Sequence, residues 1–431
     1  MKRILQDCAN RIAMTISLLA GPAIGQQFSL TMVEVPASDA QVGGPGYDFL
    51  VSVDEVTNAQ FAAFLNDAEL HNESQNPGFG DERGDNLAFR PAPFGGDVGL
   101  VAGDSSDVDA VFDISRSLLL FDGLQPVGSR FSVTAGKLDH PVVGCSWIGA
   151  VKFCNWLTID QGLGLSARCY SEGPGEVDWF PITTGTDIGG TQVATNLARD
   201  LNDAERSALV EGFEGYRMMM DQGGTAVGAT NAAARPYNEW YKVAAFDLAA
   251  PDVPRLVFGG FPFEEHTVPP DHWVHGYGRD PLLQADANYR SSGDPFDDPD
   301  ASVIATTPVG YYDGTNHGGA FATNSNDNPY GVNDLSGNVW ELLTDQVSIT
   351  DSTAPDRALA GGSYRSNVRQ VAVANRGDIG PGVTRPVVGL RVARVAAGGT
   401  AAVPALPAAG LGLLGLVLAL GGAWTLRRRA E

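Results

Sequence analysis

The second half of the sequence constrains the fold most, because beyond about residue 250 it is dominated by Gly, Pro, Asn and Asp. These residue types favour turns and irregular loops over long helices or strands. Only short runs of β-like composition interrupt the region, at Ser302–Tyr312, Ala358–Tyr364 and Val388–Val395. This pattern disfavours a helical bundle and predicts an irregular, loop-rich α+β domain that a few regular elements anchor.

Short regular elements are expected mainly in the first half of the chain. Phe49–Val53 alternates apolar and polar residues as a half-buried strand does, and it leads into the Thr-x-x-Gln capping box of Thr57–Gln60. Ser146 can cap a second helix, which carries Trp147, Val151, Cys154 and Trp156. A third short helix is expected from Pro236, since proline is favoured in a first helical turn.

Two segments, 66–139 and 170–234, are interpreted as insertions into the domain. The second contains a predicted amphipathic helix near Asn202–Phe213, and the run Met218–Met220. We expect these methionines to fill gaps in the core rather than to bind a metal.

The overall charge restricts the classes of partner. The chain carries 51 acidic against 28 basic side chains, a formal net charge of −23 at pH 7. A body this acidic is repelled by phosphate backbones, so we expect no nucleic-acid partner. Its hydrophobic content of 43% is too high for a disordered acidic chain.

Both ends of the chain have the composition of export signals rather than of a fold. Met1–Gly25 has a basic start, an apolar stretch and a small-x-small end, as a secretory signal peptide does. After a linker at 396–407, Ala408–Leu426 is uncharged and long enough to span a bilayer, and the arginine-rich 427–431 follows as a cytoplasmic tail. The domain at 26–395 is therefore expected outside the cytoplasm, in the cell envelope or beyond it, initially anchored to the membrane through 408–426.

The run Val403-Pro-Ala-Leu-Pro407, followed by this apolar span and the terminal arginines, resembles the PEP-CTERM class of bacterial sorting tails. The resemblance implies a membrane protease that cuts at the motif and passes the protein to the envelope or to exopolysaccharide. A plain tail anchor is the alternative.

Three cysteines, Cys145, Cys154 and Cys169, remain once the signal segment is removed. In an oxidising compartment one disulfide can form and one thiol is left over, and the spacing does not choose the pair. No Cys-x-x-Cys motif exists in the sequence, so a structural zinc site is not expected.

Seven segments, in order, resemble the formylglycine-generating enzyme family, whose domain is also called the sulfatase-modifying factor. They are Glu55–Asn66, His140–Leu157, Arg235–Ala245, Ala287–Tyr289, Thr307–Gly310, Asn328–Glu341 and the motifs within Gly361–Arg391. The resemblance implies an elaborated C-type-lectin-like α+β domain that covers most of 45–395.

The family resemblance also locates a missing catalytic pair. These enzymes oxidise a sulfatase cysteine with two copper-binding cysteines, whose places here fall on Val373 and, less directly, Val368. Valine supplies neither a thiolate nor a soft metal ligand, so neither copper binding nor formylglycine synthesis by this mechanism is expected. The pair in His272-Trp-Val-His275 lacks a placed third ligand and is interpreted as a loop feature.

Calcium is the metal that the residues favour, because hard cations prefer carboxylate and carbonyl oxygens. The resemblance implies one site formed by Asp334, the carbonyls of Gly337 and Val339, and Glu341. It implies a second site, whose members are Asn288, the Tyr289 carbonyl and Asp300. A hydrogen-bonded structural turn is the alternative for the first set.

The polar segment between Ser363 and Arg376 is the predicted ligand-binding region, because the corresponding loop lines the exposed pocket of lectin-like folds. Its candidate ligand-binding residues are Arg365, Ser366, Asn367, Arg369, Asn375 and Arg376. These donors suit an anionic or hydroxyl-rich ligand. The alternative is that Arg376 and its neighbours form internal salt bridges.

Three function classes follow from these observations. The leading hypothesis is an exported, non-catalytic binding or scaffold protein of the exopolysaccharide matrix, with a polysaccharide or another envelope ligand as partner. A divergent formylglycine-generating oxidase that matures sulfatases is the second, and a purely structural matrix protein is the third.

Overall fold

The computed structural model describes residues 30–396 apart from internal gaps. The gaps fall at 39–43, 92–97, 103–109, 174–177, 183–199, 223–234, 248, 251–254, 260–263, 269–270, 299, 301, 318, 320 and 347–355. The predicted signal segment 1–25, the span 408–426 and the tail 427–431 lie outside the described residues. Within the part that is described, no helix is long and apolar enough to cross a membrane.

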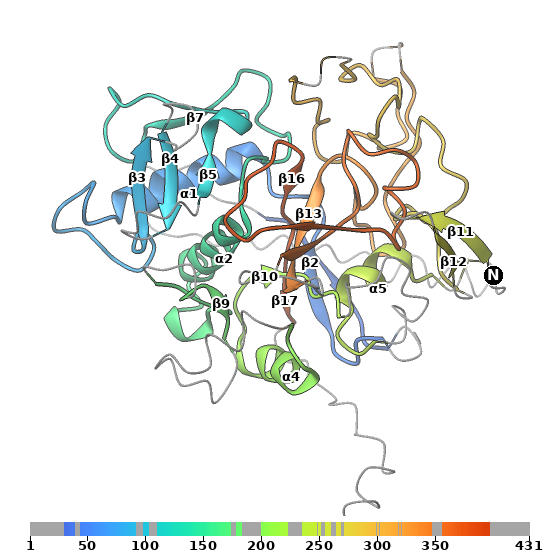
Figure 1. The fold of residues 1–431 in the computed structure, drawn as a ribbon, viewed down its shortest axis with the longest axis horizontal. Coiled ribbons are helices and arrows are strands. Elements are labelled where there is room, and N and C mark those ends of the chain that lie inside the picture. Colours follow the sequence, from blue (N-terminus) through green and yellow to red (C-terminus); the bar gives the residue numbers. More distant parts are fainter. Residues whose placement is uncertain are drawn as a thin grey trace, which may run out of the picture.

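Two four-stranded sheets lie at the centre of the molecule (Figure 1). The first has the antiparallel order β1–β2–β17–β10, formed by Met32–Val35, Phe49–Ser52, Val392–Val395 and Arg217–Met218. The second has the order β15–β14–β13–β16, formed by Arg376–Ile379, Arg357–Ala360, Trp340–Gln346 and Val388–Gly389. Only β13 and β16 run parallel in the second sheet, with Trp340 opposite Val388.

Helices begin where side chains cap their first backbone amides. The helix α1 (Asn58–Leu70) begins after Thr57, whose hydroxyl accepts from the Gln60 N–H while its own N–H donates to Gln60 Oε1. Ser146 caps α2 (Trp147–Asp160) in the same way through the Gly149 N–H. Both predicted helix starts are therefore confirmed.

The segments interpreted as insertions have secondary structure of their own. The first contains a three-stranded sheet, β3–β4–β5, and a hairpin, β6–β7, whose strands are Leu87–Pro91, Val98–Ala102, Ala110–Asp113, Leu119–Phe121 and Phe131–Val133. The second contains α4 and the pair β8–β9, formed by Asp203–Gly212, Tyr170–Ser171 and Phe180–Pro181. The helix predicted near Asn202–Phe213 is thus confirmed as α4, with Asn202 as its cap.

The remaining regular elements are short and lie between these parts. They are the 3-10 turns Ile114–Arg116 and Leu165–Ala167, the helix α5 at Glu239–Ala245, and the hairpin β11–β12 at Arg255–Gly259 and Glu264–Val268.

Three sequence expectations for regular structure are corrected. The described part of 302–312 contains no strand, because its backbone forms hydrogen bonds with groups that are not in a neighbouring strand. The Thr307 N–H, for example, donates to Asn338 Oδ1 (3.1 Å). The third helix begins at Glu239 rather than Pro236, because Asn238 provides the cap by accepting from the Tyr241 N–H.

The third correction concerns two β-like runs near the C-terminal end. The run Ala358–Tyr364 is a strand only as far as Ala360, since Gly361 and Gly362 have φ values of +87° and +76°. Val388–Val395 divides into β16 and β17, which belong to different sheets.

One hydrophobic core joins the helices to the sheets. Phe61 and Phe64 of α1 meet Phe153 and Trp156 of α2, with ring centroids 5.1 to 5.7 Å apart. Offset and edge-on aromatic pairs at such distances stabilise a core beyond the area they bury. The run Met218–Met220 is buried in the same core, as the sequence predicted.

Candidate functional site

The loop before β13 is fixed by backbone conformations that few residue types adopt. Asp334, Gly337 and Asn338 all have positive φ, at 59°, 95° and 56°. A Cβ on Gly337 would lie 2.3 Å from the Asn288 carbonyl oxygen, so only glycine fits there. This close approach lets the Asn338 N–H donate to the same carbonyl (2.8 Å) and ties the loop to the segment around Asn288.

A buried arginine holds this loop against the first sheet. Arg391 lies between β16 and β17 and donates through Nε to Glu341 Oε1 at 2.8 Å. Its other nitrogens donate to the carbonyls of Ser52, Val53 and Asn333 at 2.7 to 3.0 Å. Both groups are 1% exposed, so this ion pair lies in the low-dielectric interior, where it has full hydrogen-bond partners.

Two further carboxyls beside Arg391 have raised pKa values. Burial, the nearby Asp334 carboxylate and other acids raise the pKa of Glu55 well above its usual range. Burial raises the pKa of Asp334 to about 6, although the Gly310 N–H and Asn326 Nδ2 donate to its two oxygens at 2.7 and 2.8 Å. The cluster therefore holds more carboxyls than its single guanidinium can neutralise.

In the first predicted calcium set, protein donors engage both carboxylates. Both Glu341 oxygens already accept, one from Arg391 and one from Trp240 Nε1 (2.9 Å), and both Asp334 oxygens have their own donors. Gly337 and Val339 lie in the loop between these two residues. No group of three His, Cys, Asp or Glu that could hold a metal occurs among the described residues.

The members of the second predicted calcium set have different surroundings. Asn288 is buried, and its Oδ1 has no hydrogen-bond partner among the described residues. An oxygen in this state can coordinate an ion or accept a hydrogen bond from a water molecule. The Tyr289 carbonyl accepts from the Ser292 N–H (2.9 Å). Asp300 is fully exposed, and its carboxylate accepts from Ser302 N–H (2.8 Å), an interaction that lowers its pKa.

The two valines at the places of the catalytic cysteines have different surroundings. Val373 is completely buried, whereas Val368 is 48% exposed. The cysteines that the structure describes, Cys145, Cys154 and Cys169, are all free and buried. Burial raises the pKa of each thiol, to about 12 for Cys169, so none of them is a thiolate at neutral pH.

The predicted ligand segment divides into residues that face inward and residues that do not. Arg376 donates to both carboxylate oxygens of Asp221 and lies over the Trp240 ring, with its guanidinium carbon 4.7 Å from the ring centroid. Asn375 is buried and donates to the Gln370 carbonyl (3.0 Å). Asn367 is exposed and closes a local turn by accepting from the Arg369 N–H (2.9 Å).

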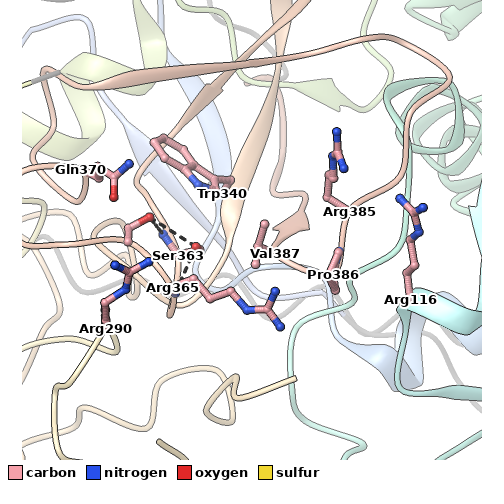
Figure 2. Close-up of a pocket in the computed structure, with 10 residues that line it drawn as sticks. Arg116, Arg290, Trp340, Ser363, Arg365, Gln370, Arg385, Pro386 and Val387 are labelled. Carbon is pink, nitrogen blue, oxygen red and sulfur yellow. Dashed lines mark hydrogen bonds between the residues drawn. The ribbon is translucent and has the colours of Figure 1, made fainter. Parts of the chain in front are cut away.

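Arg365 and Ser366 instead line a cavity of about 500 Å³ (Figure 2). The cavity contains four arginines, from separate parts of the sequence, together with one tryptophan. Its lining residues are Arg116, Arg290, Trp340, Ser363, Arg365, Ser366, Gln370, Arg385, Pro386 and Val387. Figure 2 shows Arg290 on one side and Arg116 and Arg385 on the other, with Arg365 between them.

The four cavity arginines differ in how far the protein already engages them. Arg116 pairs with Asp113 (3.1 Å) and donates to the Thr384 carbonyl, which holds the first insertion against the cavity. Arg365 donates to the Val303 carbonyl (3.3 Å). The exposed guanidiniums of Arg290 and Arg385 have no ion-pair partner among the described residues. They are therefore available to an anion that enters the cavity.

Backbone contacts hold the cavity walls together. The Arg290 N–H donates to the Ser366 carbonyl (2.9 Å), which joins two walls. The Ser363 N–H donates to Ser366 Oγ (3.0 Å), and the Trp340 N–H donates to the Val387 carbonyl (2.9 Å). Sequence reasoning missed Arg116, Arg290 and Arg385 because only the folded chain brings these distant residues together, and it interpreted Trp340 as a core residue rather than as a platform for a sugar.

The chain has similarity to a family model and to solved structures. No curated protein matches the chain. Among solved structures the chain is similar to CarF, to Treponema denticola variable protein 1 and to PvdO from Pseudomonas aeruginosa, at 16% sequence identity in each case. The match to CarF has a TM-score of 0.41 and covers 85% of this chain and 98% of CarF. The other two matches have TM-scores of 0.39 and 0.36, and each covers 88% of this chain and 100% of the matched chain. The family model described as "Sulfatase-modifying factor enzyme 1-like domain" matches residues 2–234 and 272–396. Because this match spans most of the sequence, the chain belongs to the family of sulfatase-modifying factor enzyme 1-like domains.

Proposed function

We propose that this protein is a non-catalytic member of its family that binds an anionic ligand in the arginine-lined cavity. The observation that carries the proposal is that four guanidiniums line one cavity, and that two of them, on Arg290 and Arg385, lack an ion-pair partner among the described residues. Guanidinium groups bind carboxylate, sulfate and phosphate oxygens through charge-assisted hydrogen bonds.

The charge of the whole chain supports this reading of the cavity. With a formal net charge of −23, a concentration of cations in one hollow is unusual for this protein. The general negative field would repel a long polyanion that lies over the whole surface. A short anion, or the acidic end of a longer chain, can enter the cavity while it avoids most of that repulsion.

The absence of a thiol at the two valines supports the non-catalytic part of the proposal. Val373 is buried among apolar neighbours, and the described cysteines are buried thiols with raised pKa values. Incubation of the purified full chain with copper and a sulfatase-type cysteine peptide should form no formylglycine in the peptide. Conversion of that cysteine to an aldehyde would support the divergent oxidase instead.

The proposed location is the cell envelope or the exopolysaccharide matrix. Its support is the composition of 1–25 and of 408–431, which the sequence alone provides. Mass mapping of the envelope-associated protein should find neither Met1–Gly25 nor the apolar span 408–426. Recovery of an intact span would favour a plain membrane anchor over proteolytic sorting.

Calcium at Asn288 is the structural part of the proposal. Its support is the buried, unpartnered Oδ1 of Asn288, since such an oxygen is the kind of donor that calcium accepts. Asn288 is not one of the cavity-lining residues, although Arg290, two residues further along the chain, is.

Calorimetric titration of the full chain with inorganic sulfate tests the binding proposal. The change Arg385→Ala should weaken sulfate binding about tenfold or more, because a hydrogen bond to a charged group contributes about 1.5–3 kcal/mol. Arg369→Ala is the matched control, since it removes the same charge from an exposed residue that does not line the cavity. Equal losses in both variants would point to a diffuse charge effect, and the absence of saturable binding would favour a structural matrix protein.

A further inference from the structure

The cavity contains one aromatic surface, the side chain of Trp340 at the start of β13. Its backbone is fixed on one side by β16, through the pair Trp340–Val388 and the bond from its N–H to the Val387 carbonyl. Its ring borders β15 near Gly377, where a Cβ would lie 3.7 Å from Cη2. The indole is therefore held in place by two strands, yet it remains half-buried rather than fully enclosed.

The other described tryptophans are engaged or buried in ways that Trp340 is not. Trp147 donates from Nε1 to the Leu343 carbonyl and lies under Arg357, at 3.7 Å from the ring centroid. Trp240 donates to Glu341 Oε2 and lies under Arg376. Trp156 and Trp273 donate to carboxylates, and Trp179 is 1% exposed.

In contrast, the indole N–H of Trp340 has no acceptor and its ring has no aromatic or guanidinium partner among the described residues. An amphipathic indole in this state offers a flat apolar face and a free donor to a ligand. Most of the other polar groups at the cavity are guanidinium donors. The ligand must therefore supply acceptors, negative charge and a flat apolar face.

We infer that the cavity binds an acidic saccharide, with a sugar ring stacked on Trp340 and its sulfate or carboxylate groups on Arg290 and Arg385. This inference rests on the proposed function and specifies its ligand class. A pyranose ring combines an apolar C–H face, which can stack on the indole, with a rim of hydroxyl oxygens, which can accept from the cavity's donors. The arginines stand on opposite sides of the cavity (Figure 2), so they suit acidic groups at two edges of a saccharide better than a single terminal phosphate.

The charge and size of the protein favour a saccharide over a nucleic acid. A polynucleotide would bring one phosphate for each unit against a chain of net charge −23, whereas a cavity of about 500 Å³ takes a ligand of small-molecule size. A mononucleotide, which could also stack on an indole, is an alternative that the experiment separates.

The test compares four probes on the full chain by calorimetry: inorganic sulfate, a sulfated uronate-containing disaccharide, the same disaccharide without its sulfate and carboxylate groups, and uridine monophosphate. We expect the acidic disaccharide to bind at least tenfold more tightly than sulfate or the uncharged disaccharide, because neither of these uses both the arginines and Trp340, and more tightly than uridine monophosphate. Trp340→Leu should weaken disaccharide binding about tenfold and weaken sulfate binding far less, because sulfate has no flat face to place on the indole. Trp340→Phe keeps a flat ring and should retain most of the affinity.

The outcomes distinguish this inference from the proposed function. If sulfate binds but the disaccharide binds no more tightly and is insensitive to Trp340→Leu, the saccharide inference is overturned and the anion site stands. If neither sulfate nor the disaccharide binds, both fail. Tighter binding of uridine monophosphate than of the disaccharide would also overturn the inference. Circular dichroism checks that the Leu variant folds. If it does not, the affinity of wild type for the acidic disaccharide, compared with its affinities for sulfate and for the uncharged disaccharide, decides between the outcomes.

Discussion

The substitution Asp334→Asn tests the description of the buried charge cluster. The Asp334 carboxyl is 2% exposed, and its folded pKa is about 6, whereas an aspartate in an unfolded chain titrates near 4. At pH 7 the folded protein therefore contains a carboxylate that burial disfavours. At about 1.4 kcal/mol for each pH unit between the two pKa values, the ionised group reduces the free energy of unfolding by about 3 kcal/mol.

Asparagine can replace this aspartate with little change of geometry. It has the same shape and tolerates the left-handed φ of 59° at this position. Its carbonyl can accept from the Gly310 N–H. Asn326 faces this position with Nδ2 in the wild type, and a turn of the Asn326 side-chain amide lets its unpartnered Oδ1 accept from the new amide instead. We expect Asp334→Asn to raise the free energy of unfolding at pH 7 by about 2–3 kcal/mol.

The pH dependence has a defined sign. Between pH 4 and pH 6 the folded state binds more protons at Asp334 than the unfolded state, so this group makes the protein more stable as the pH falls through that range. The advantage of Asp334→Asn should therefore be largest at pH 7 and close to zero at pH 4. Urea denaturation of both proteins at pH 4, 5, 6 and 7, with chelator present to exclude calcium, measures it. A variant that is less stable than wild type at pH 7, or a difference that does not vary with pH, would refute the reasoning.

Three further predictions follow from the same region. Arg391→Met should lower the free energy of unfolding by about 3–5 kcal/mol in urea denaturation, because it leaves Glu341 buried without its cation; Arg394→Met, on the half-buried neighbour, should change it by less than about 1 kcal/mol. Gly337→Ala should lower the melting temperature far more than Gly331→Ala, as thermal unfolding measures. Both glycines have positive φ, but only at Gly337 does an oxygen lie 2.3 Å from the added Cβ. Calcium should raise the melting temperature over that in chelator, and identical melts with no calcium in the purified protein would exclude the site at Asn288.

Local chemistry explains which parts of the fold were predictable. The capping box of Thr57 and Gln60 and the cap at Ser146 involve residues three apart, so the sequence contains all the information that their helices need to start. The strand expected in the run 302–312 was a wrong prediction, because a β-like composition does not show whether a neighbouring strand is available to pair with it. There the Asn338 side chain, far along the chain, accepts the Thr307 N–H in place of a neighbouring strand.

The cavity was predictable only in part, for the same reason. Arg365 and Ser366 lie in a segment that the family resemblance singled out, and both line the cavity. Arg116, in contrast, belongs to a segment interpreted as an insertion. A hydrogen bond from its guanidinium to the Thr384 carbonyl fixes its position at the cavity. No local pattern in the sequence connects residues that are this far apart.

The central claim is that the arginine cavity binds an anion, and calorimetry of the full chain with inorganic sulfate tests it most directly. The wild-type protein should bind sulfate saturably, and its affinity should fall as the ionic strength rises. The double variant Arg290→Ala, Arg385→Ala should show no saturable binding, while the control variant Arg369→Ala should still bind sulfate. Saturable binding of unchanged affinity in the double variant would contradict the account.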